Sequence, residues 1–464
     1  MSQTLATEQR PLRVAIIGAG PSGFYAADAL FRAKIPVVVD AFDRLPTPFG
    51  LLRGGVAPDH QQMKTVGKYY ERVAATPGFS FWGNVKVGQD ISVEELKRHY
   101  DVLIFSSGAE TDRHLEIPGE SLIGSNTATA FVGWYNGHPD YRDHPFDLTA
   151  EAVAIIGQGN VAIDVARILA KTPHELKDSD IADHAMQALA KTNIKDIYLI
   201  GRRGPVQSAF TELEIKELGE LEDCDVIVNP KDMVLNAESQ AELDDPTNNK
   251  ARKNVAVLHE FSTRQPQGKK KRIHVLFFKS PIAMNGESHV TGLTLEHNHL
   301  EGPAGKQKAV ASGETETLPC TLVFRSVGYR GVPIEGVPFD PKRGVFPNEA
   351  GRILDGTTPV PGMYCSGWIK RGPSGVLGTN KPDSAATIAS VLEDLPNLKG
   401  CEVPDSEAVR AVLNSRQVQV VSFEDWKHLD AEEVRRGETV GKPREKFTRV
   451  EDVLSFLRSV LIEK

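Results

Sequence analysis

Two glycine-rich segments have the spacing that places a backbone turn against a nucleotide pyrophosphate. The first, GAGPSG at residues 18–23, directly follows an apolar run at residues 14–17. Gly18 permits a tight turn, Gly20 lets the backbone approach the phosphates, and Gly23 lets the following helix pack close to the strand. The N-terminus of that helix then points unbonded N–H groups and a positive dipole end at the phosphates.

An acidic residue near the end of the next strand is the usual partner of such a turn. The segment IPVVVDAFD, residues 35–43, provides two candidates, Asp40 and Asp43. Either carboxylate could accept hydrogen bonds from the ribose hydroxyls of a bound dinucleotide. The first unit therefore predicts a strand–helix–strand fold that holds FAD.

The second segment, GQGNVA at residues 157–162, follows an apolar run at residues 153–156, and Ala162 replaces its third glycine. No acid ends the next strand, where Arg202 and Arg203 stand instead. A guanidinium matches phosphate geometry, so this pair favours the 2′-phosphate of NADP over the free ribose of NAD. The alternative is an arginine pair that is simply solvated. The gap before the pair is longer than usual, which predicts a helical insertion over residues 172–193.

The rest of the chain supports an α/β fold built on these units. Its 464 residues exceed one ordinary core, and 40% apolar and 25% charged residues are typical of globular proteins. Three more apolar runs end at small residues and a glycine, in DVLIFSSGAE, TLVFRSVGYR and GMYCSGWIKRG. Such junctions line the crevice at the carboxyl ends of parallel strands.

Composition excludes several classes of function. The net charge of -8 argues against general nucleic-acid binding. The four cysteines form no CxxC pair or metal-like cluster, which indicates a reduced, cytoplasmic setting and no dithiol redox centre. The N-terminus has no secretory apolar segment, and no run approaches the length of a membrane-spanning helix.

Three regions lie outside these motifs, and only the last of them is predicted to have no chemical role. Residues 236–254 are polar and predict a loop with a mobile edge, and residues 259–281 predict two strands around a Gly-Lys turn. The basic run at residues 269–272 is then the solvated tip of a hairpin. The chain after about residue 400 predicts an appended α/β tail.

One FAD site and one NADPH site together imply hydride transfer between nicotinamide and flavin. A disulfide reductase would need a CxxC beside the flavin, which is absent, whereas a monooxygenase stays open. Four segments then resemble one family: LPTPFGLLRGGVAPDHQQMK, GQGNVAIDVARIL, GRRGPVQSAFTELEIKEL and GWIKRGPSGVLGTNKPDS. They are similar to the adrenodoxin-reductase-like ferredoxin–NADP⁺ reductases, including the bacterial FprA-type enzymes. The likeness spans about residues 12–460, and Gly367-Trp368 stands where most FAD/NAD flavoproteins have Gly-Asp.

The resemblance implies a set of FAD contacts. Asp43 stands where the family has glutamate against the adenosine ribose, and Asp40 is its rival. Trp368 and the loop after it are expected at the flavin ring and ribityl chain. The FAD residues implied are Gly18, Gly20, Ser22, Gly23, Asp43, Leu51, Val87, Trp368, Gly375, Val376 and Leu377.

The resemblance also implies the NADP contacts and three further residues. The NADP residues are Arg113, Gln158, Gly159, Asn160, Val161, Arg202, Arg203, Glu214 and Gly375. His60 and Glu217 match a polar pair that tunes proton supply or partner docking; the alternative for His60 is a helix-terminal or interface histidine. Asp164 either supports the nicotinamide loop or is a helix carboxylate with no special role.

The fold implied is α/β, with two Rossmann-like dinucleotide-binding domains. The FAD domain is discontinuous, residues 1–110 and 333–464, and the NADP domain is residues 111–332. NADPH passes a hydride to flavin N5, and single electrons then go to a ferredoxin-type iron–sulfur protein. An acidic ferredoxin would dock on a local basic patch, for which Lys250, Arg252, Lys253, Lys370 and Arg371 are candidates.

Two alternatives remain beside the reductase. One is a flavin-dependent NADPH oxidase, monooxygenase or glutamate-synthase-type electron-input subunit. The other is a nucleotide-holding redox sensor, although the intact glycines in both segments argue against it.

Overall fold

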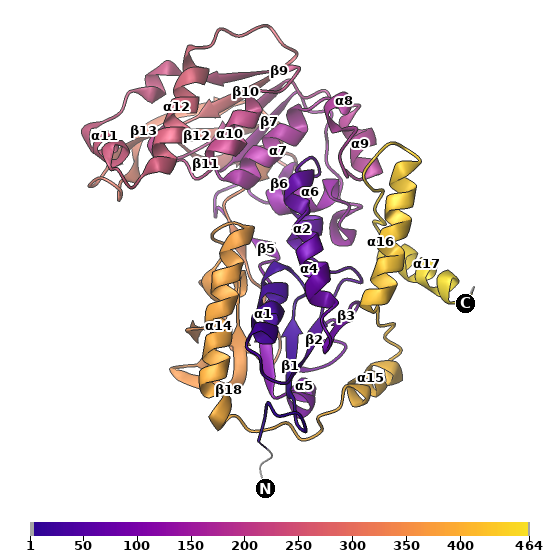
Figure 1. The fold of residues 1–464 in the computed structure, drawn as a ribbon. Coiled ribbons are helices and arrows are strands. Elements are labelled where there is room, and N and C mark those ends of the chain that lie inside the picture. Colours follow the sequence, from indigo (N-terminus) through magenta and orange to yellow (C-terminus); the bar gives the residue numbers. More distant parts are fainter. Residues whose placement is uncertain (1–3, 463–464) are drawn as a thin grey trace. The chain divides into compact units, whose positions relative to one another are not determined.

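The computed structural model describes residues 4–462, and the chain forms two compact units (Figure 1). The first unit contains the chain up to Thr111 and again from Gly328 onward, and the second runs from Asp112 to Val327. The boundaries expected from the sequence were 110/111 and 332/333. The N-terminal segment, for which no secretory signal is predicted, begins with three residues that lie outside the described part of the chain.

The first unit is built on a seven-stranded sheet in the order β16-β17-β18-β4-β1-β2-β3. The five strands from β18 to β3 are parallel, and β16 and β17 add antiparallel at one edge. The strands are β1 (Leu12–Ile17), β2 (Val37–Phe42), β3 (Phe79–Trp82), β4 (Val102–Phe105), β16 (Asn348–Glu349), β17 (Arg352–Asp355) and β18 (Thr358–Cys365). The pair β5 (Thr111–Asp112) and β15 (Tyr329–Arg330) forms a separate ladder.

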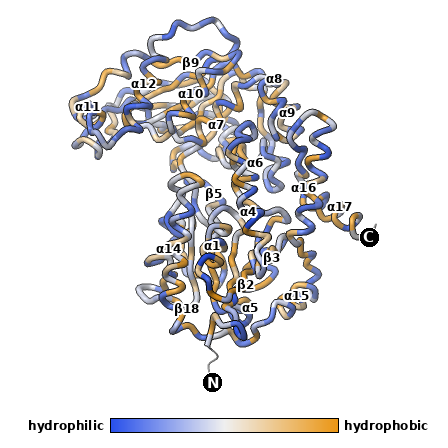
Figure 2. The backbone as a smooth tube through the Cα atoms, viewed as in Figure 1, coloured by the Kyte–Doolittle hydropathy of each residue, from blue (hydrophilic) through white to orange (hydrophobic). Residues whose placement is uncertain are grey.

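The central strands of this sheet are largely apolar because both faces are covered, and the two charges in them, Arg13 of β1 and Asp40 of β2, lie 3.5 Å apart. Along β1, Val14 and Ile16 belong to one buried cluster, whereas Ala15 and Ile17 belong to another. The hydrophobic colouring along β2 in Figure 2 reflects the same burial. A continuous apolar run that ends at a glycine is therefore a buried parallel strand, as predicted.

Helices from both ends of the chain cover this sheet, and α1 and α14 pack side by side (Figure 1). The helices are α1 (Pro21–Arg32), α2 (Leu51–Gly54), α3 (Gln61–Lys64), α4 (Gly67–Ala74), α5 (Val93–His99), α13 (Trp368–Arg371), α14 (Asn380–Asp394), α15 (Ser406–Ser415), α16 (Phe423–Glu438) and α17 (Val450–Ile462). The predicted α/β tail is wrong, because the chain after residue 400 forms the helices α15 to α17. Its extended segment makes only a single bridge, between Val421 and Gly83.

The second unit contains a six-stranded, all-parallel sheet in the order β6-β14-β7-β8-β10-β9 and a three-stranded antiparallel sheet, β11-β12-β13. The strands are β6 (Ser125–Thr127), β7 (Ala152–Ile156), β8 (Asp196–Ile200), β9 (Cys224–Val228), β10 (Lys271–Leu276), β11 (Lys279–Asn285), β12 (Gly292–Glu301), β13 (Lys308–Leu318) and β14 (Leu322–Arg325). The helices are α6 (Ala128–Tyr135), α7 (Asn160–Ala170), α8 (Pro173–Leu176), α9 (Asp183–Leu189), α10 (Glu212–Leu218), α11 (Ala237–Asp244) and α12 (Asn249–Thr263). The predicted helical insertion over residues 172–193 corresponds to α8 and α9.

The loop predicted over residues 236–254 is wrong, because this stretch forms α11 and the start of α12. Sparse apolar residues hide the helix, yet Ala251, Val257, Leu258 and Phe261 share the buried face of α12. The side chain of Asn248 caps the helix by accepting a hydrogen bond from the N–H of Ala251. Polar composition alone therefore misled the prediction, since the spacing of three and four residues was present.

The predicted hairpin around residues 268–270 is also wrong. Lys271 and Arg272 begin β10, which lies inside the parallel sheet between β8 and β9. The Lys271 ammonium donates to the carbonyl oxygen of Leu169 at 2.7 Å, and burial lowers the pKa of Lys271. The Arg272 guanidinium binds both carboxylate oxygens of Asp196. These two charges have partners inside the fold, and the expected solvated tip does not include them.

No helix among the described residues is long and apolar enough to cross a membrane.

A buried ion pair fastens the C-terminal helices to the segment that follows β2 in the first unit. The Arg53 guanidinium donates to both carboxylate oxygens of Glu433, at 2.8 and 2.5 Å, and lies over the ring of Trp426. Glu433 is fully buried and also accepts from the N–H of Phe447 at 2.9 Å. Burial opposes the charge of Glu433, but Arg53, Arg444 and the N–H of Phe447 together keep the pKa of Glu433 below its ordinary value.

Glu433→Gln should destabilise the first unit by about 3–5 kcal/mol, because it leaves the Arg53 charge buried without compensation. Urea unfolding of the variant and the wild type measures the difference. Glu432→Gln is the matched control, since its partner Arg435 is 65% exposed and the pair should matter by less than about 1 kcal/mol. Because the pKa of Glu433 is lowered, the contribution of the pair is present above the ordinary glutamate pKa and is lost as the pH falls through the folded value. Equal losses in both variants would contradict this role.

Candidate functional site

The first glycine turn can only be built with glycine. Gly18 has a φ of +108°, and a Cβ there would lie 2.5 Å from the carbonyl oxygen of Ser106 at the end of β4. A Cβ on Gly23 would lie 2.2 Å from the carbonyl oxygen of Gly18. The turn is therefore pressed between β4 and α1, which is the geometry that the predicted roles of these glycines require.

The N-terminus of α1 is left open for an anion. Its N-cap residue is Gly20, and no side chain caps the helix. Gly50, with a φ of +48°, passes so close that its Cβ would lie 3.0 Å from the Cα of Gly20. Gly50 was not predicted from the sequence. It lies in the segment PTPFGLL next to Leu51, which is exposed in the structure, and a glycine at this place could have indicated a tight turn.

The two candidate acids after β1 lie in different environments. Asp40 is 1% exposed and accepts hydrogen bonds from the Tyr100 hydroxyl at 2.7 Å and the Ser406 hydroxyl at 3.0 Å. Asp43 is only half-buried and accepts from the N–H of Ala19, inside the glycine turn, at 2.9 Å. Burial raises the pKa of Asp43 to about 6, against the lowering effect of its two backbone donors. Asp40 thus supports the packing of the sheet, and Asp43 borders the turn.

Four buried serines join the strand ends beneath this turn. The Ser22 hydroxyl shares hydrogen bonds with the hydroxyls of Ser366 at 2.5 Å and Ser384 at 3.1 Å, and Ser366 lies 3.2 Å from that of Ser106. The side chain of Ser22 is therefore committed to this cluster, which leaves its backbone as the part that can face a phosphate. Of these four serines only Ser22 was predicted, because the sequence does not show which strand ends lie next to one another.

One buried hydroxyl near the turn, that of Ser107, has no hydrogen-bond partner in the described structure. Ser107 directly follows Ser106 at the carboxyl end of β4, and its N–H would lie 3.0 Å from a Cβ on Gly18. A buried polar group is costly unless something binds it. Together with the glycine turn, the uncapped helix and Asp43, this hydroxyl makes a set of polar groups that fits a bound dinucleotide.

Trp368 is held at the end of β18 by an acid that sequence analysis did not identify. Asp383, in the first turn of α14, accepts from the N–H of Gly367 at 2.6 Å. The Trp368 ring stacks on Tyr329 with a centroid distance of 5.3 Å. The nearby loop contains Gly375, which has a φ of +82°, and Val376, which is 60% exposed. The two remaining predicted FAD residues, Val87 and Leu377, are half-buried.

Two of the predicted docking residues are not available on the surface. The Lys370 ammonium lies 3.1 Å from one oxygen of Asp383, and the Arg371 guanidinium lies 3.5 Å from the other. Their side chains are 12% and 18% exposed. The prediction that they form an open basic patch is therefore wrong, because they neutralise the acid that anchors Gly367.

The second glycine turn repeats the first. Gly157 has a φ of +133°, and a Cβ there would lie 2.2 Å from the carbonyl oxygen of Ser326 at the end of β14. α7 has Gly159 as its N-cap residue, with no side-chain cap and open space where a Cβ would stand. Ala162 is fully buried, so the small side chain in place of the third glycine is accommodated.

Polar side chains of this turn hold it to its neighbours. The Gln158 side chain donates to the carbonyl oxygen of Leu276 at 3.0 Å, and the Asn160 side chain accepts from the N–H of Thr211 at 2.9 Å. These predicted NADP residues thus fix β10 and α10 against the turn, and their backbone atoms remain for the phosphates. Val161 is half-buried at the start of α7, and Arg113 is exposed.

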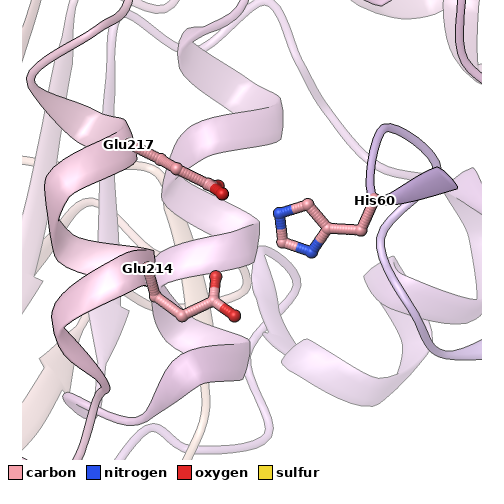
Figure 3. Close-up of side chains that lie close together, drawn as sticks. All are labelled: His60, Glu214 and Glu217. Carbon is pink, nitrogen blue, oxygen red and sulfur yellow. The ribbon is translucent and has the colours of Figure 1, made fainter. Parts of the chain in front are cut away.

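The acids on α7 and α10 contact a buried arginine that was not predicted from the sequence. Arg167 is 1% exposed and lies 2.5 Å from Asp164 and 3.1 Å from Glu217. Glu214 is buried on the same face of α10, one turn before Glu217 (Figure 3). His60, also drawn in Figure 3, is the residue that precedes α3 in the first unit.

Arg202 and Arg203 occupy the exposed turn after β8, as predicted. Burial, followed by the like charge of Arg202, lowers the pKa of Arg203. Arg203 also lines a cavity of about 190 Å³ within the second unit. A local excess of positive charge therefore surrounds this opening.

Comparison with known proteins assigns the family. Residues 12–257 match the family model of pyridine nucleotide-disulphide oxidoreductases. The chain is 42% identical to the NADPH-ferredoxin reductase FprA of Mycobacterium tuberculosis, over 96% of this chain and 99% of that one. The chain belongs to the family of NADPH–ferredoxin reductases. It is also 41% identical to the mitochondrial NADPH:adrenodoxin oxidoreductase of Homo sapiens, over 97% of this chain and 93% of that one.

Solved structures of this reductase family have the same fold. The structure of Mycobacterium tuberculosis FprA in complex with NADPH matches with a TM-score of 0.91 and 41% identity, over 97% of this chain and 100% of that one. The resemblance and the fold class predicted from the sequence, two dinucleotide-binding α/β units of which the first is discontinuous, are thereby confirmed.

If Asp43 is the ribose contact expected from the sequence, the affinity for FAD should fall about tenfold between pH 7.5 and pH 5, because ribose hydroxyls would donate to its ionised form and its pKa is raised to about 6. FAD titrations of the apoprotein, followed by flavin fluorescence, measure this profile. Asp43→Asn cannot ionise and should bind more weakly at pH 7.5 with a flatter profile. An unchanged pH slope in this variant would exclude Asp43 as the ribose contact and restore Asp40 as the rival.

Proposed function

We propose that this chain is an FAD-dependent NADPH–ferredoxin reductase. The observation that carries the proposal is the pair of glycine turns on uncapped helices, one bordered by Asp43 and the other followed by Arg202 and Arg203. Relatives with these activities in their names, and an FprA structure solved with NADPH, match almost the whole chain. When bound, FAD accepts a hydride from NADPH and passes single electrons to an iron–sulfur protein.

The residues of the first unit bind and orient the flavin nucleotide. The backbone N–H groups at the start of α1 would hold its pyrophosphate, and Asp43 its adenosine ribose. Asp383 fixes Gly367, and through it the position of Trp368, against the end of β18. Leu51, Val87, Gly375, Val376 and Leu377 complete the proposed lining of the flavin.

The residues of the second unit select the nicotinamide nucleotide. The start of α7 would hold its pyrophosphate, and the two arginines its 2′-phosphate. The Arg167 guanidinium forms ion pairs with Asp164 and Glu217 and so positions both carboxylates. We retain Asp164 as support for the nicotinamide loop, and His60 with Glu217 as the pair that supplies protons or contacts the partner; the family resemblance supports both roles.

The electron acceptor is proposed to be an acidic iron–sulfur protein of the ferredoxin type. Of the candidate docking residues, Lys253 is paired with Glu212 at 2.9 Å, and Arg252 donates to the carbonyl oxygens of Leu243 and Pro246. A cytoplasmic location belongs to the same proposal. It is supported by four free cysteines, although relatives named as mitochondrial show that location varies within the family.

Replacing both Arg202 and Arg203 with glutamine should raise the KM for NADPH by roughly a hundredfold or more, since each charge-assisted contact contributes about 1.5–3 kcal/mol. NADH activity should hardly change, because NADH has no 2′-phosphate. Steady-state kinetics with ferricyanide measure both cofactors on the same preparations. An equal loss with the two cofactors would mean that the pair supports the fold and does not recognise the phosphate.

The purified protein should show a flavin absorption spectrum, prefer NADPH to NADH in reducing ferricyanide, and reduce cytochrome c only when a ferredoxin is added. The ferredoxin dependence follows from single-electron transfer to an iron–sulfur protein. A colourless protein that holds no FAD would sink the proposal. Reduction of ferricyanide without any transfer to ferredoxins would favour the oxidase or monooxygenase alternative.

A further inference from the structure

A small cavity in the second unit lies beside the turn that contains Arg202 and Arg203. The helix α12, which comes later in the chain, forms part of its wall. The cavity volume of about 190 Å³ is too small for a whole dinucleotide but suits one end of it. The helix α12 packs against the short helical turn Pro205–Gln207 to close it. The residues that line it are Arg203, Val206, Gln207, Ser208, Glu242, Asn248, Lys250 and Ala251.

Lys250 is placed in this cavity at an electrostatic cost. It lies in the first turn of α12, where the helix dipole disfavours a positive charge, and no acidic residue occupies that turn. Its ammonium donates to the carbonyl oxygen of Ala209 at 2.6 Å, a neutral partner. Burial alone lowers the pKa of Lys250. The charge is thus held in position but is not neutralised by this contact, which leaves two of its three N–H donors for another group.

The opposite wall adds further positive charge. Arg203 donates weakly to the carbonyl oxygen of Gln207, at 3.4 Å, and stands beside Arg202. Glu242 is the single acid among the lining residues, and it accepts from the Gln207 side chain at 2.9 Å and the N–H of Gly305 at 3.3 Å. Two cations therefore face the cavity from separate elements, and its acid is already used to hold the wall.

A hydrogen-bond acceptor on the same wall also lacks a partner within the described residues. The side-chain oxygen of Gln207 is buried and accepts no hydrogen bond. A purine ring with an exocyclic amino group would supply a donor to this oxygen. The cavity thus combines cations for a phosphate with an acceptor for an adenine.

We propose that Lys250 is a third cation that recognises the 2′-phosphate of NADP(H). Lys250 binds this phosphate from α12, and Arg202 and Arg203 bind it from the turn after β8. Gln207 accepts from the adenine amino group in the same cavity. This inference rests on the proposed function and adds to it a specificity residue from a separate element. It replaces the sequence-based prediction that Lys250 belongs to a ferredoxin-docking patch.

The test compares two adenosine nucleotides on the FAD-loaded enzyme by isothermal titration calorimetry: adenosine 2′,5′-bisphosphate and adenosine 5′-monophosphate. Lys250→Gln should weaken binding of the bisphosphate roughly tenfold or more, since it removes one charge-assisted contact. Binding of the monophosphate should change by less than about twofold, because only the 2′-phosphate meets the cation. Lys250→Arg, which keeps the charge, should retain most of the discrimination.

Lys253→Gln is the matched control. Lys253 lies one turn later on α12, is 52% exposed and is paired with Glu212. Its removal should leave the affinities of both nucleotides unchanged. The readout is the ratio of the two affinities, so a general loss of folding, which weakens both nucleotides alike, would not imitate the expected result.

The outcomes separate this inference from the proposed function. If Lys250→Gln keeps the wild-type ratio while Arg203→Gln loses it, the role of Lys250 is overturned and the NADPH preference stands. If the wild-type enzyme binds the two nucleotides equally, both the role of Lys250 and the NADPH preference fail. If Lys250→Gln weakens both nucleotides to the same extent, its role is structural and the inference is overturned.

Discussion

Each unit of this reductase depends on the contact between one glycine and one backbone carbonyl. Gly18 lies against the carbonyl oxygen of Ser106, and Gly157 lies against that of Ser326. In both cases any side chain would collide with the end of the neighbouring strand. The backbone there also has a positive φ, which glycine adopts without strain. This tight turn delivers the following helix to the strand ends with its N-terminus uncapped. The remaining features of both nucleotide crevices are arranged around those two openings.

The same scaffold is adapted to two nucleotides by the charges placed beside it. In the first unit a partly buried carboxylate, Asp43, borders the turn, and burial makes its pKa high for an aspartate. In the second unit the equivalent strand is followed by two arginines, and one of them, Arg203, lines a cavity together with Lys250 of α12. The buried charge of Glu433, in contrast, is neutralised by its pair with Arg53. The charges beside the two turns thus differ in sign, as two different nucleotides would require.

The sequence predicted what is local and missed what depends on distant segments meeting. The strands β1 and β7, the glycine turns, the arginine turn and the α/β class all follow from short runs whose physics is self-contained. The serine cluster around Ser22 and the contact of Arg167 with Glu217 were not predicted, because their members lie far apart in the sequence. The anchoring acid Asp383 was missed because it reaches Gly367 across an intervening loop. α12 was missed for another reason: its apolar stripe is narrow, and the polar composition around it indicated a loop. Lys271 was predicted to be a surface charge because a basic run at the start of a buried strand cannot be distinguished by sequence from one at a hairpin tip.

The serine cluster has a consequence for the order in which the protein is made. Ser22 and Ser106 emerge early in synthesis, but their partners Ser366 and Ser384 lie in the last quarter of the chain. The second unit is continuous and has all of its strands once β14 is complete. Because domains fold as units while the chain emerges from the ribosome, the nicotinamide unit can close first. The N-terminal strands of the flavin unit must wait, with an unfinished sheet edge at β4, until β18 arrives to pair with it. The C-terminal part of the chain, which is synthesised last, therefore determines when the nucleotide-binding turn near the N-terminus is complete.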